Sequence, residues 1–329
     1  METVEKGLSV VLTERCNLDC RYCLRRTSYR AGDFLDLERL KTILRLAAER
    51  GYTELVATGG EALLHPRFDE FVRAAACHPW RFVLETNGIL LTERRLEELH
   101  ASWSVERLQV LVSLDSNLES VHDRLRGEGA FRQAVDCIRR VKRRGLFLHI
   151  NATITPVNLF DPQSLDAFLR FCRELGVDRV YFSRVVLVEH GQACGNFLLT
   201  PAQVSGQREL FAGRGDRGEW FLAPGFWTLT ERPSCPVLEL SGVCVTPHGL
   251  SPCLLMSDVV VGTHEEFASV IDRGVLPAFN RIRNMVLAGP ETVGGGACSE
   301  CSLRIREHLG LAHSVRILGT LRHEIGNPR

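Results

Sequence analysis

The sequence predicts an α/β protein with a parallel sheet, and three observations lead to this fold class. Short apolar segments alternate with longer amphipathic segments six times between residues 8 and 188, which is typical of β/α units with right-handed crossovers. Polar residues cluster directly after the strands, where the site of a parallel barrel lies. The length of 329 residues suits one barrel of about 200–250 residues plus a smaller module.

The units follow one another in chain order. The expected strands cover residues 8–13, 54–57, 81–85, 108–114, 146–155 and 179–188. The expected helices are one capped by Asp36 and ended by Gly51, one over about 67–77, one opened by Thr92, one over about 130–144 and one from Asp161 to Gly176. The alternation stops at residues 190–233, where Thr200 and Pro201 begin another helix, and we expect a linker there.

Composition and charge exclude several classes of partner. Lys+Arg and Asp+Glu both number 40, so the net charge is zero and we expect neither a nucleic-acid nor a membrane partner. No apolar run approaches the roughly 18 residues of a membrane span, and residues 1–7 are too polar and acidic for a signal peptide. Twelve cysteines then indicate a reducing compartment and metal binding, so we expect a cytoplasmic protein.

Three cysteines follow the first expected strand in a CxxxCxxC spacing. They are Cys16, Cys20 and Cys23, with Tyr22 just before the third. A [4Fe–4S] cluster that only carries electrons takes four thiolates, so three would leave one iron open, as a catalytic zinc keeps an open position. A zinc knuckle is the alternative, but it needs a second CxxC or an HxxxH-type pair close by, and neither follows in the next fifty or so residues.

This segment resembles the cluster-binding loop of the radical S-adenosylmethionine (SAM) superfamily. Residues 58–61, Thr-Gly-Gly-Glu, resemble the GGE motif of that family. The resemblance implies a partial (β/α)6 barrel of the TIM type that binds one [4Fe–4S] cluster and SAM. Gly59 and Gly60 would then let the backbone approach the ligand, and Glu61 would accept a hydrogen bond from the methionyl ammonium group.

The resemblance also assigns SAM contacts further along the chain. Ser113 and Asp115 resemble the fourth-strand pair that faces SAM, and Asp115 would hold ribose hydroxyls. Arg126 would pair with the SAM carboxylate, with an ordinary surface arginine as the alternative. Tyr22 would neighbour the adenine, with a core tyrosine as the alternative. The implied chemistry is reductive cleavage of SAM to a 5′-deoxyadenosyl radical that abstracts a hydrogen atom.

A second group of cysteines lies near the C-terminal end. Its members are Cys235, Cys253, Cys298 and Cys301. Their spacing resembles the Twitch domain, a shortened SPASM extension, which implies a second [4Fe–4S] cluster with no open iron; a structural zinc is the alternative. Cys244 would replace one ligand or lie free near the cluster. The expected domains are thus a barrel (1–189), a linker or substrate-side segment (190–233), a Twitch domain (234–310) and a tail (311–329).

The remaining cysteines divide into two kinds. Cys77, Cys137 and Cys172 fall on expected helices, and we interpret them as small buried hydrophobes. Cys194 follows the sixth strand and lies near the expected barrel mouth. A thiol there, or Cys244, would be able to donate a hydrogen atom to a substrate radical.

Two reactions are compatible with these features. In the first, a dehydrogenase takes hydrogen from a carbinol carbon, Arg184 or Glu189 binds or deprotonates the hydroxyl, and the second cluster accepts the remaining electron. Arg184 and Glu189 are more often members of structural ion pairs. In the second reaction, an epimerase returns hydrogen from Cys194 or Cys244. The spacing resembles aminocyclitol and aminoglycoside biosynthesis enzymes, which implies a small, polar, sugar-like substrate.

Two further classes remain as alternatives. Peptide-modifying radical SAM enzymes often carry an N-terminal peptide-recognition domain, and a first strand that begins by residue 8 leads us to expect none here. A non-catalytic electron carrier or sensor would not need an open iron. For the enzyme classes, the resemblance implies an external electron donor of the flavodoxin or ferredoxin type.

Overall fold

The computed structural model describes residues 6–23, 33–186, 195–214, 219–223, 243–253 and 259–272, residue 283 and the backbone of residues 315–316. Among them one sheet runs in the order β7-β6-β5-β4-β3-β2-β1-β8-β9. Its strands are β1 (Lys6–Thr13), β2 (Tyr52–Gly59), β3 (Arg81–Thr86), β4 (Leu108–Ser113), β5 (Phe147–Ile154), β6 (Arg179–Arg184), β7 (Trp220–Leu222), β8 (Val243–Thr246) and β9 (Gly249–Ser251). Neighbours are parallel except β8 and β9. A separate parallel pair joins β10 (Val259–Val260) to β11 (Val315–Arg316).

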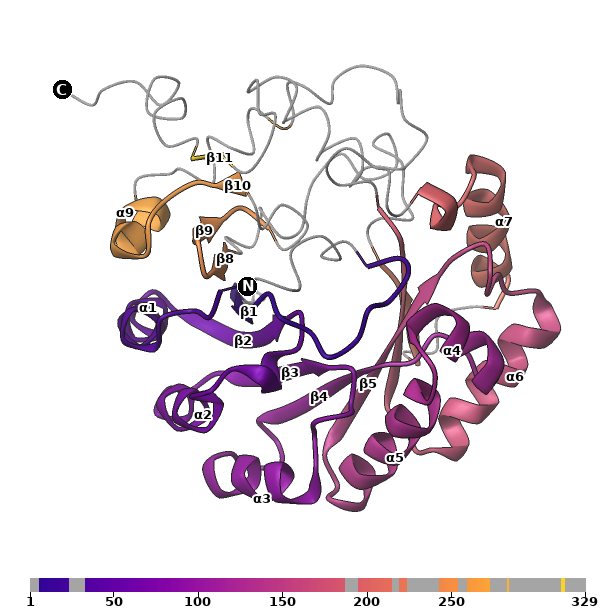
Figure 1. Cartoon of the computed structure of the whole chain (residues 1–329), viewed down its shortest axis with the longest axis horizontal. Helices are drawn as coiled ribbons and strands as arrows, with labels where there is room; N and C mark the ends of the chain where they lie inside the picture. The colour runs from indigo at the N-terminus through magenta and orange to yellow at the C-terminus, as the bar shows by residue number, and fades with distance from the viewer. Residues whose placement is uncertain are drawn as a thin grey trace.

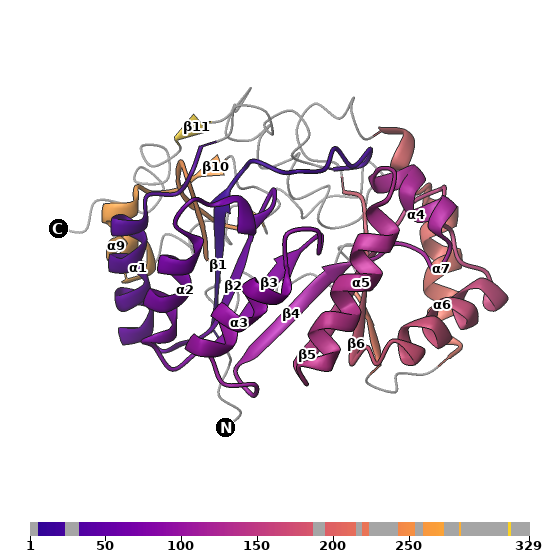
Figure 2. The same cartoon turned by 60° about the horizontal axis from the view of Figure 1, so that its bottom comes forward.

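Most of the helices lie along the outer side of the curved sheet (Figures 1 and 2). They are α1 (Leu37–Glu49), α2 (Phe68–Ala76), α3 (Glu93–Ser102), α4 (Glu119–Arg126), α5 (Ala130–Arg143), α6 (Pro162–Glu174), α7 (Pro201–Ala212) and α9 (Phe267–Asp272), with 3₁₀ turns η1 (Ala62–Leu64), η2 (Gly195–Phe197) and η5 (His264–Glu266). The predicted starts are confirmed, because side chains of Asp36, Thr92, Asp161 and Thr200 cap α1, α3, α6 and α7. No helix in the described ranges is long and apolar enough to span a bilayer.

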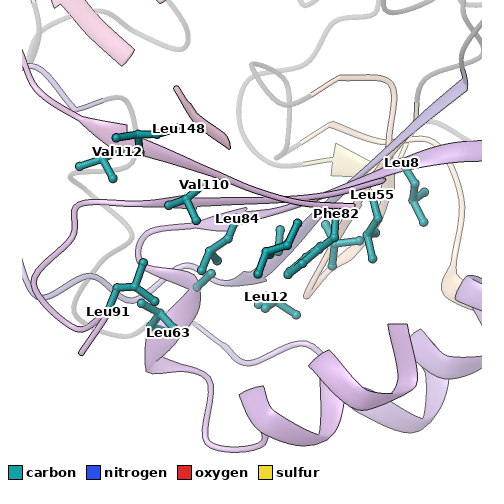
Figure 3. Packing of buried hydrophobic residues seen from close by; sticks show 14 of the residues in the cluster. Leu8, Leu12, Leu55, Leu63, Phe82, Leu84, Leu91, Val110, Val112 and Leu148 are labelled. Carbon is teal, nitrogen blue, oxygen red and sulfur yellow. The ribbon is translucent and has the colours of Figure 1, made fainter. Parts of the chain in front are cut away.

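The outer face of the sheet carries the hydrophobic core. Leu8, Leu55 and Phe82 are in register on β1, β2 and β3 and are fully buried against the helices (Figure 3). Burying one such side chain contributes about 1.5–3 kcal/mol. A slip of one residue would turn this whole row away from the helices, so the apolar row fixes which face of each strand points inward.

The inner face carries many polar side chains, in contrast to the packed apolar interior of a closed barrel. Apolar residues lie on this face too, among them Val56, Leu111 and Phe221, but many of the residues that alternate with the buried row carry carboxylates, amides, hydroxyls or cationic groups. By register they include Glu54, Arg81, Glu85, Gln109, Ser113, His149, Asn151, Thr153, Arg179, Tyr181 and Ser183. Four pairs among them are joined directly: Arg81 to Glu54 at 2.6 Å, Gln109 to His149 at 2.8 Å, Ser183 to Asn151 at 2.9 Å and Ser183 to Thr153 at 3.2 Å. The sheet therefore separates an apolar outer layer from an inner face of mixed, largely polar character.

The six predicted strands and the α/β fold class are confirmed, and the sheet extends beyond them at both edges. β7 follows α7 and pairs in parallel with β6, so residues 201–222 continue the alternation that we expected to stop at residue 190. β8 pairs in parallel with β1, although it falls within the predicted C-terminal module. Strands of three or four residues contain too few positions to show a periodic pattern.

The interpretation of the helical cysteines is confirmed for two of them. Cys137 and Cys172 are buried in the main hydrophobic core. For Cys77 the prediction was wrong, because this residue ends α2 and its side chain is exposed, with Sγ 3.4 Å from Arg73 O. The eight described cysteines form no disulfide with one another.

Phe211→Ala tests whether α7 and β7 belong to the barrel core. Phe211 is fully buried, and its ring lies 4.6 Å from that of Phe182 on β6 and 5.0 Å from that of Trp220 on β7. Truncating a buried Phe costs about 3–5 kcal/mol, so we expect a loss of this size in urea unfolding. The exposed Val105→Ala serves as control and should cost less than about 0.5 kcal/mol. Equal losses for the two variants would contradict this packing.

Candidate functional site

The loop that carries the three cysteines leaves the sheet at Thr13, the last residue of β1. Its stem crosses the end of β2, where Gly60 N–H donates to Thr13 O and Glu61 N–H donates to Arg15 O, both at 2.8 Å. A Cβ on Gly60 would lie 2.3 Å from Arg15 O, and one on Gly59 would lie 2.3 Å from Thr13 O. The two glycines were expected to make room for a ligand, and in the structure they make room for this stem.

The three thiols lie on one folded loop and differ in exposure. Cys20 is buried, whereas Cys16 and Cys23 are half-buried. Leu18 N–H donates to Cys16 Sγ at 3.4 Å, and Cys23 N–H donates to Cys20 O at 3.1 Å. Burial raises the pKa of Cys16 to about 11 and that of Cys20 to about 12. Both are therefore neutral thiols at pH 7 until a metal displaces their protons.

This donor set fits an iron–sulfur cluster better than a single metal ion. Within the described ranges, no three His, Cys, Asp or Glu side chains are arranged around one ion. A cluster does not require that arrangement, because its cysteines ligate different iron atoms. Three thiolates from Cys16, Cys20 and Cys23 would hold three irons of a [4Fe–4S] cluster and leave the fourth for another ligand.

Glu61 lies behind this loop and is almost completely buried. Its carboxylate accepts hydrogen bonds from the Thr86 hydroxyl at 2.9 Å, Asn87 N–H at 2.9 Å and Leu63 N–H at 3.3 Å. Burial nevertheless raises the pKa of Glu61 to about 7. Because a carboxylate offers about four acceptor sites, one remains for a donor such as an ammonium group.

Asn87 joins Glu61 to the cysteine loop, a role that the sequence did not predict. Its backbone N–H donates to Glu61, and its side-chain Nδ2 donates to Asn17 Oδ1 at 2.7 Å. The same Nδ2 lies 3.9 Å from Cys16 Sγ. The position of Asn87 directly after β3 was the sequence feature that indicated a place in the site, because functional polar residues of a parallel barrel gather at the strand ends.

A second buried carboxylate fixes the other side of the loop. Tyr22 donates its hydroxyl to Asp115 Oδ2 at 2.6 Å. Arg126, the last residue of α4, donates to both oxygens of Asp115 at 2.7 and 3.0 Å, and Thr153 N–H donates to Oδ1 at 2.9 Å. Asp115 is completely buried and the Arg126 side chain is 8% exposed. The cysteine loop and the ends of β4, α4 and β5 therefore meet at one carboxylate.

Electrostatics keep this network ionised. Burial alone would raise the pKa of Asp115, but the Arg126 guanidinium outweighs it and holds that pKa below its usual range. Burial likewise opposes the charge on Arg126, yet Asp115 raises the Arg126 pKa above its ordinary value. Burial raises the pKa of Tyr22, so its hydroxyl remains a donor. Removing one partner of a buried ion pair costs about 3–5 kcal/mol.

Neighbouring groups hold the backbone around Asp115. His122 Nδ1 accepts from Asp115 N–H at 3.1 Å, and burial lowers the pKa of His122 to about 4, which keeps this ring neutral. Asn158 Nδ2 donates to Asp115 O and to Thr153 O, both at 2.9 Å. Asn158 is another residue that sequence reasoning did not assign to the site, although it follows a predicted strand.

The predicted SAM residues Tyr22, Asp115 and Arg126 are brought together, but their hydrogen bonds are to one another. All four acceptor sites of Asp115 are occupied, so a ribose hydroxyl can be accepted only if one of these bonds opens. Ser113 lies two residues earlier, half-buried and in register with Asn151. Direct contact of these residues with SAM stays a prediction.

The residues predicted to act on substrate are not assembled within the described ranges. Glu189 and Cys194 lie outside them. Arg184 ends β6 in register with the core residue Ile154, which places it on the outer rather than the inner face. Cys244 is buried in β8 level with Ser9. Because a strand rises about 3.3 Å per residue, Cys244 sits about 13 Å below the strand end where the cysteine loop begins.

The predicted auxiliary cluster has only one described ligand. Cys253 is half-buried just after β9 and packs against the main core. The other three predicted ligands lie outside the described residues, namely Cys235, Cys298 and Cys301. The second cluster therefore stays a prediction from spacing.

The fold and this loop together define an α/β partial barrel with a three-cysteine loop at the carboxyl ends of its strands. Residues 10–172 match the family model of the radical SAM superfamily. This part of the chain therefore matches a radical SAM domain, a family whose cofactors are SAM and a [4Fe–4S] cluster. The motif predictions for the cysteine loop and the barrel fold agree with this assignment.

Several known proteins are similar to this chain. The antilisterial bacteriocin subtilosin biosynthesis protein AlbA of Bacillus subtilis is 29% identical over 46% of this chain and 33% of its own length. An AdoMet-dependent heme synthase of Methanosarcina barkeri is 32% identical over 58% of this chain and 53% of its own length. Streptococcus suis SuiB, crystallised with SAM, superposes on this chain with a TM-score of 0.62 and 18% sequence identity. The superposition covers 76% of this chain and 60% of SuiB. The chain thus spans about a third to a half of the two curated relatives.

Glu61→Gln is expected to stabilise the iron-free protein and to weaken SAM binding. The folded pKa of about 7 lies above the ordinary 4.5, so the buried charge lowers stability fully above pH 7 and not at all below pH 4.5. Removing that charge should raise the free energy of unfolding at pH 8 by up to about 3 kcal/mol. It should raise the dissociation constant of SAM about tenfold or more.

Urea unfolding at pH 8 and pH 4.5, with SAM binding measured on the reconstituted protein, checks both effects. The exposed Glu97→Gln is the matched control and should change neither quantity. A Glu61→Gln variant that loses equal stability at both pH values would contradict the role assigned to burial.

Proposed function

We propose that this chain is a radical SAM oxidoreductase that converts a secondary alcohol of a small sugar-like substrate to a ketone. The observation that carries the proposal is the loop of Cys16, Cys20 and Cys23, held at the barrel mouth between Glu61 and Asp115. Cluster and SAM, when bound, supply a strong hydrogen-atom abstractor. The polar side chains on the inner face below this loop support a polar substrate over an apolar one.

The protein residues would contribute binding and orientation. Glu61 retains one acceptor site for an ammonium donor, and Asn87 ties that carboxylate to the cysteine loop. The Asp115–Arg126 pair, closed from water, fixes the loop that bears Tyr22. This preorganisation places the reacting groups in advance, which is the protein's main contribution to cofactor-dependent catalysis.

The oxidation balances as follows. The carbinol carbon loses one hydrogen atom, its hydroxyl loses one proton to a base, and one electron remains to be accepted as the C=O bond forms. Glu189 is the proposed base. The cysteines of the predicted auxiliary [4Fe–4S] cluster, Cys235, Cys253, Cys298 and Cys301, are the proposed site of the electron acceptor. An external flavodoxin- or ferredoxin-type protein is the proposed electron donor.

Two other reactions compete with this one. An epimerase needs a thiol beside the substrate radical, and the depth of Cys244 in β8 disfavours that residue as the donor, which leaves Cys194. Peptide modification is favoured by the similarity to AlbA, whose name assigns it to bacteriocin biosynthesis. Both are outcomes of the experiment below.

The test is mass spectrometry of a panel of cyclitols and aminocyclitols incubated anaerobically in D₂O with reconstituted protein, SAM and dithionite. We expect 5′-deoxyadenosine and a product lighter by two hydrogens. Cys16→Ala should abolish both, because it removes a cluster thiol. Cys77→Ala, which removes an exposed thiol on α2, should leave both unchanged.

Each other outcome contradicts a distinct part of the proposal. A product heavier by one mass unit, from solvent deuterium, would replace the dehydrogenase with an epimerase. Formation of 5′-deoxyadenosine without any change in the cyclitols would remove this substrate class and favour a peptide substrate. Absence of 5′-deoxyadenosine would contradict the radical SAM activity itself.

A further inference from the structure

The turn of the hairpin formed by β8 and β9 lies against the stem of the cysteine loop. Thr246 and Gly249 are register partners at the ends of the two strands, so His248 lies in the turn between them. His248 Nε2 is 3.3 Å from Glu14 Oε2. Glu14 is the first residue after β1 and precedes Cys16 by two positions. A residue of the C-terminal hairpin therefore contacts the stem of the loop that carries the thiols.

The backbone of this turn is held from several sides. His248 N–H donates to the Thr246 hydroxyl at 3.2 Å, and that hydroxyl donates to Gly249 O at 3.1 Å. Thr246 is completely buried, and its carbonyl oxygen lies 2.7 Å from His264 Nε2. Gly249 has a φ of +144°, and a Cβ there would lie 2.5 Å from Gly262 O, so no larger residue fits. The turn therefore presents the His248 side chain from a fixed backbone.

The residues that His248 faces lie where the chain before the cysteines meets the chain after them. Thr13 forms an antiparallel bridge with Phe34. Asp33 O accepts hydrogen bonds from the Thr13 hydroxyl at 3.0 Å and from Glu14 N–H at 3.4 Å. This pairing brings two acidic residues, Glu14 and Asp33, together at the base of the cysteine loop.

His248 supplies a positive charge to these two acidic residues. The Glu14 side chain is 13% exposed and that of His248 is 43% exposed, so water screens their interaction only in part. The hydrogen bond to Glu14 and the charges of Glu14 and Asp33 raise the pKa of His248, against the opposing effect of its partial burial. Without His248, two like charges would remain at the point where the loop closes.

The same C-terminal segment has a second attachment to the barrel, far from the cysteine loop. Asp272 on α9 accepts hydrogen bonds from Arg50 at 2.6 and 2.9 Å. Arg50 lies between α1 and the start of β2, at the opposite end of the sheet from the cysteine loop. Phe267 on α9 is fully buried, with its ring 6.3 Å from that of Tyr52. The segment is therefore docked without His248, whose contact serves the loop itself.

We propose that His248 is a positioning residue for the cysteine loop: through Glu14 it holds the base of the loop and balances the negative charge beside the thiols. The reduction potential of an iron–sulfur cluster depends on the charge around it, so an uncompensated Glu14 would make the cluster harder to reduce. Cys253 follows β9 by two residues, so the hairpin that contacts the first cysteine loop also leads to a thiol of the second group. The inference rests on the cluster of the proposed function but not on its substrate.

The test compares the reduction potential of the reconstituted cluster in the wild-type and variant proteins by redox titration with EPR detection. The cluster followed is the one whose signal changes when SAM is added, because SAM binds at an open iron. His248→Gln removes the cation and leaves Glu14 uncompensated. A unit charge about 10 Å away in an effective dielectric of about 20 changes an equilibrium about tenfold. We therefore expect the ratio of reduced to oxidised cluster to fall about tenfold, a potential lower by about 59 mV.

Two further variants and a second readout separate charge from general loosening. His248→Lys restores a cation and should bring the ratio back to within about threefold of the wild type. Asp272→Asn weakens the attachment at α1 and should leave the potential unchanged. In the iron-free protein, His248→Gln should accelerate hydrogen exchange of the Glu14 amide, which donates to Asp33 O, by about threefold or more.

The outcomes separate this inference from the proposed function. An unchanged potential in His248→Gln would overturn the inference, and so would an equal shift in Asp272→Asn, because loosening of the whole segment would then explain it. If His248→Gln assembles no cluster, the Glu14 amide decides: faster exchange in this variant alone supports the inference, and exchange at the wild-type rate overturns it. A wild-type chain without a SAM-responsive cluster would overturn the proposed function, and the same amide comparison would still decide whether His248 holds the loop.

Discussion

A single carboxylate removed from water, that of Asp115, determines where the cysteine loop lies. An isolated buried charge is prohibitively unfavourable, so every acceptor site must be filled. Four donors fill them, and they come from Tyr22, Arg126 and the backbone of Thr153. Because these residues are far apart in sequence, satisfying Asp115 requires the loop, α4 and the ends of β4 and β5 to be in place together. The network thus couples folding of the barrel to positioning of the thiols.

The rest of the site follows from the alternation of the strands. One parity of residues forms the apolar outer row that packs on the helices (Figure 3), and the other parity lines the inner face with polar groups. At the carboxyl ends of the strands the chain must turn, and there it places Thr13, Gly60, Asn87, Asp115 and Asn158. Each of them touches the cysteine loop or supports a residue that does. Binding and catalytic groups can be placed there without disturbing the core, as in other parallel barrels.

The strands, the longer helices and the cysteine loop could be predicted from the sequence, because each is specified by residues that are close together in the chain. Strand and helix segments with caps such as Asp36 and Asp161 depend on neighbouring residues and were predicted within a few positions. The closure of Asp115 by Tyr22 and Arg126 could not be predicted, since those contacts span 93 and 11 residues. The short α4, β7 and β8 were missed because few residues carry too little periodicity. The exposure of Cys77 depended on where α2 ends.

Hydrogen exchange at the Arg21 amide tests most directly whether Asp115 docks the cysteine loop. This N–H donates to Leu125 O at 2.9 Å, and the bond depends on the loop lying against α4. In the iron-free protein we predict that the Arg21 amide is protected, that Asp115→Asn removes most of this protection, and that the exposed control Asp136→Asn keeps it. Exchange of Arg21 at the rate of an unfolded peptide in the wild-type chain would contradict the account.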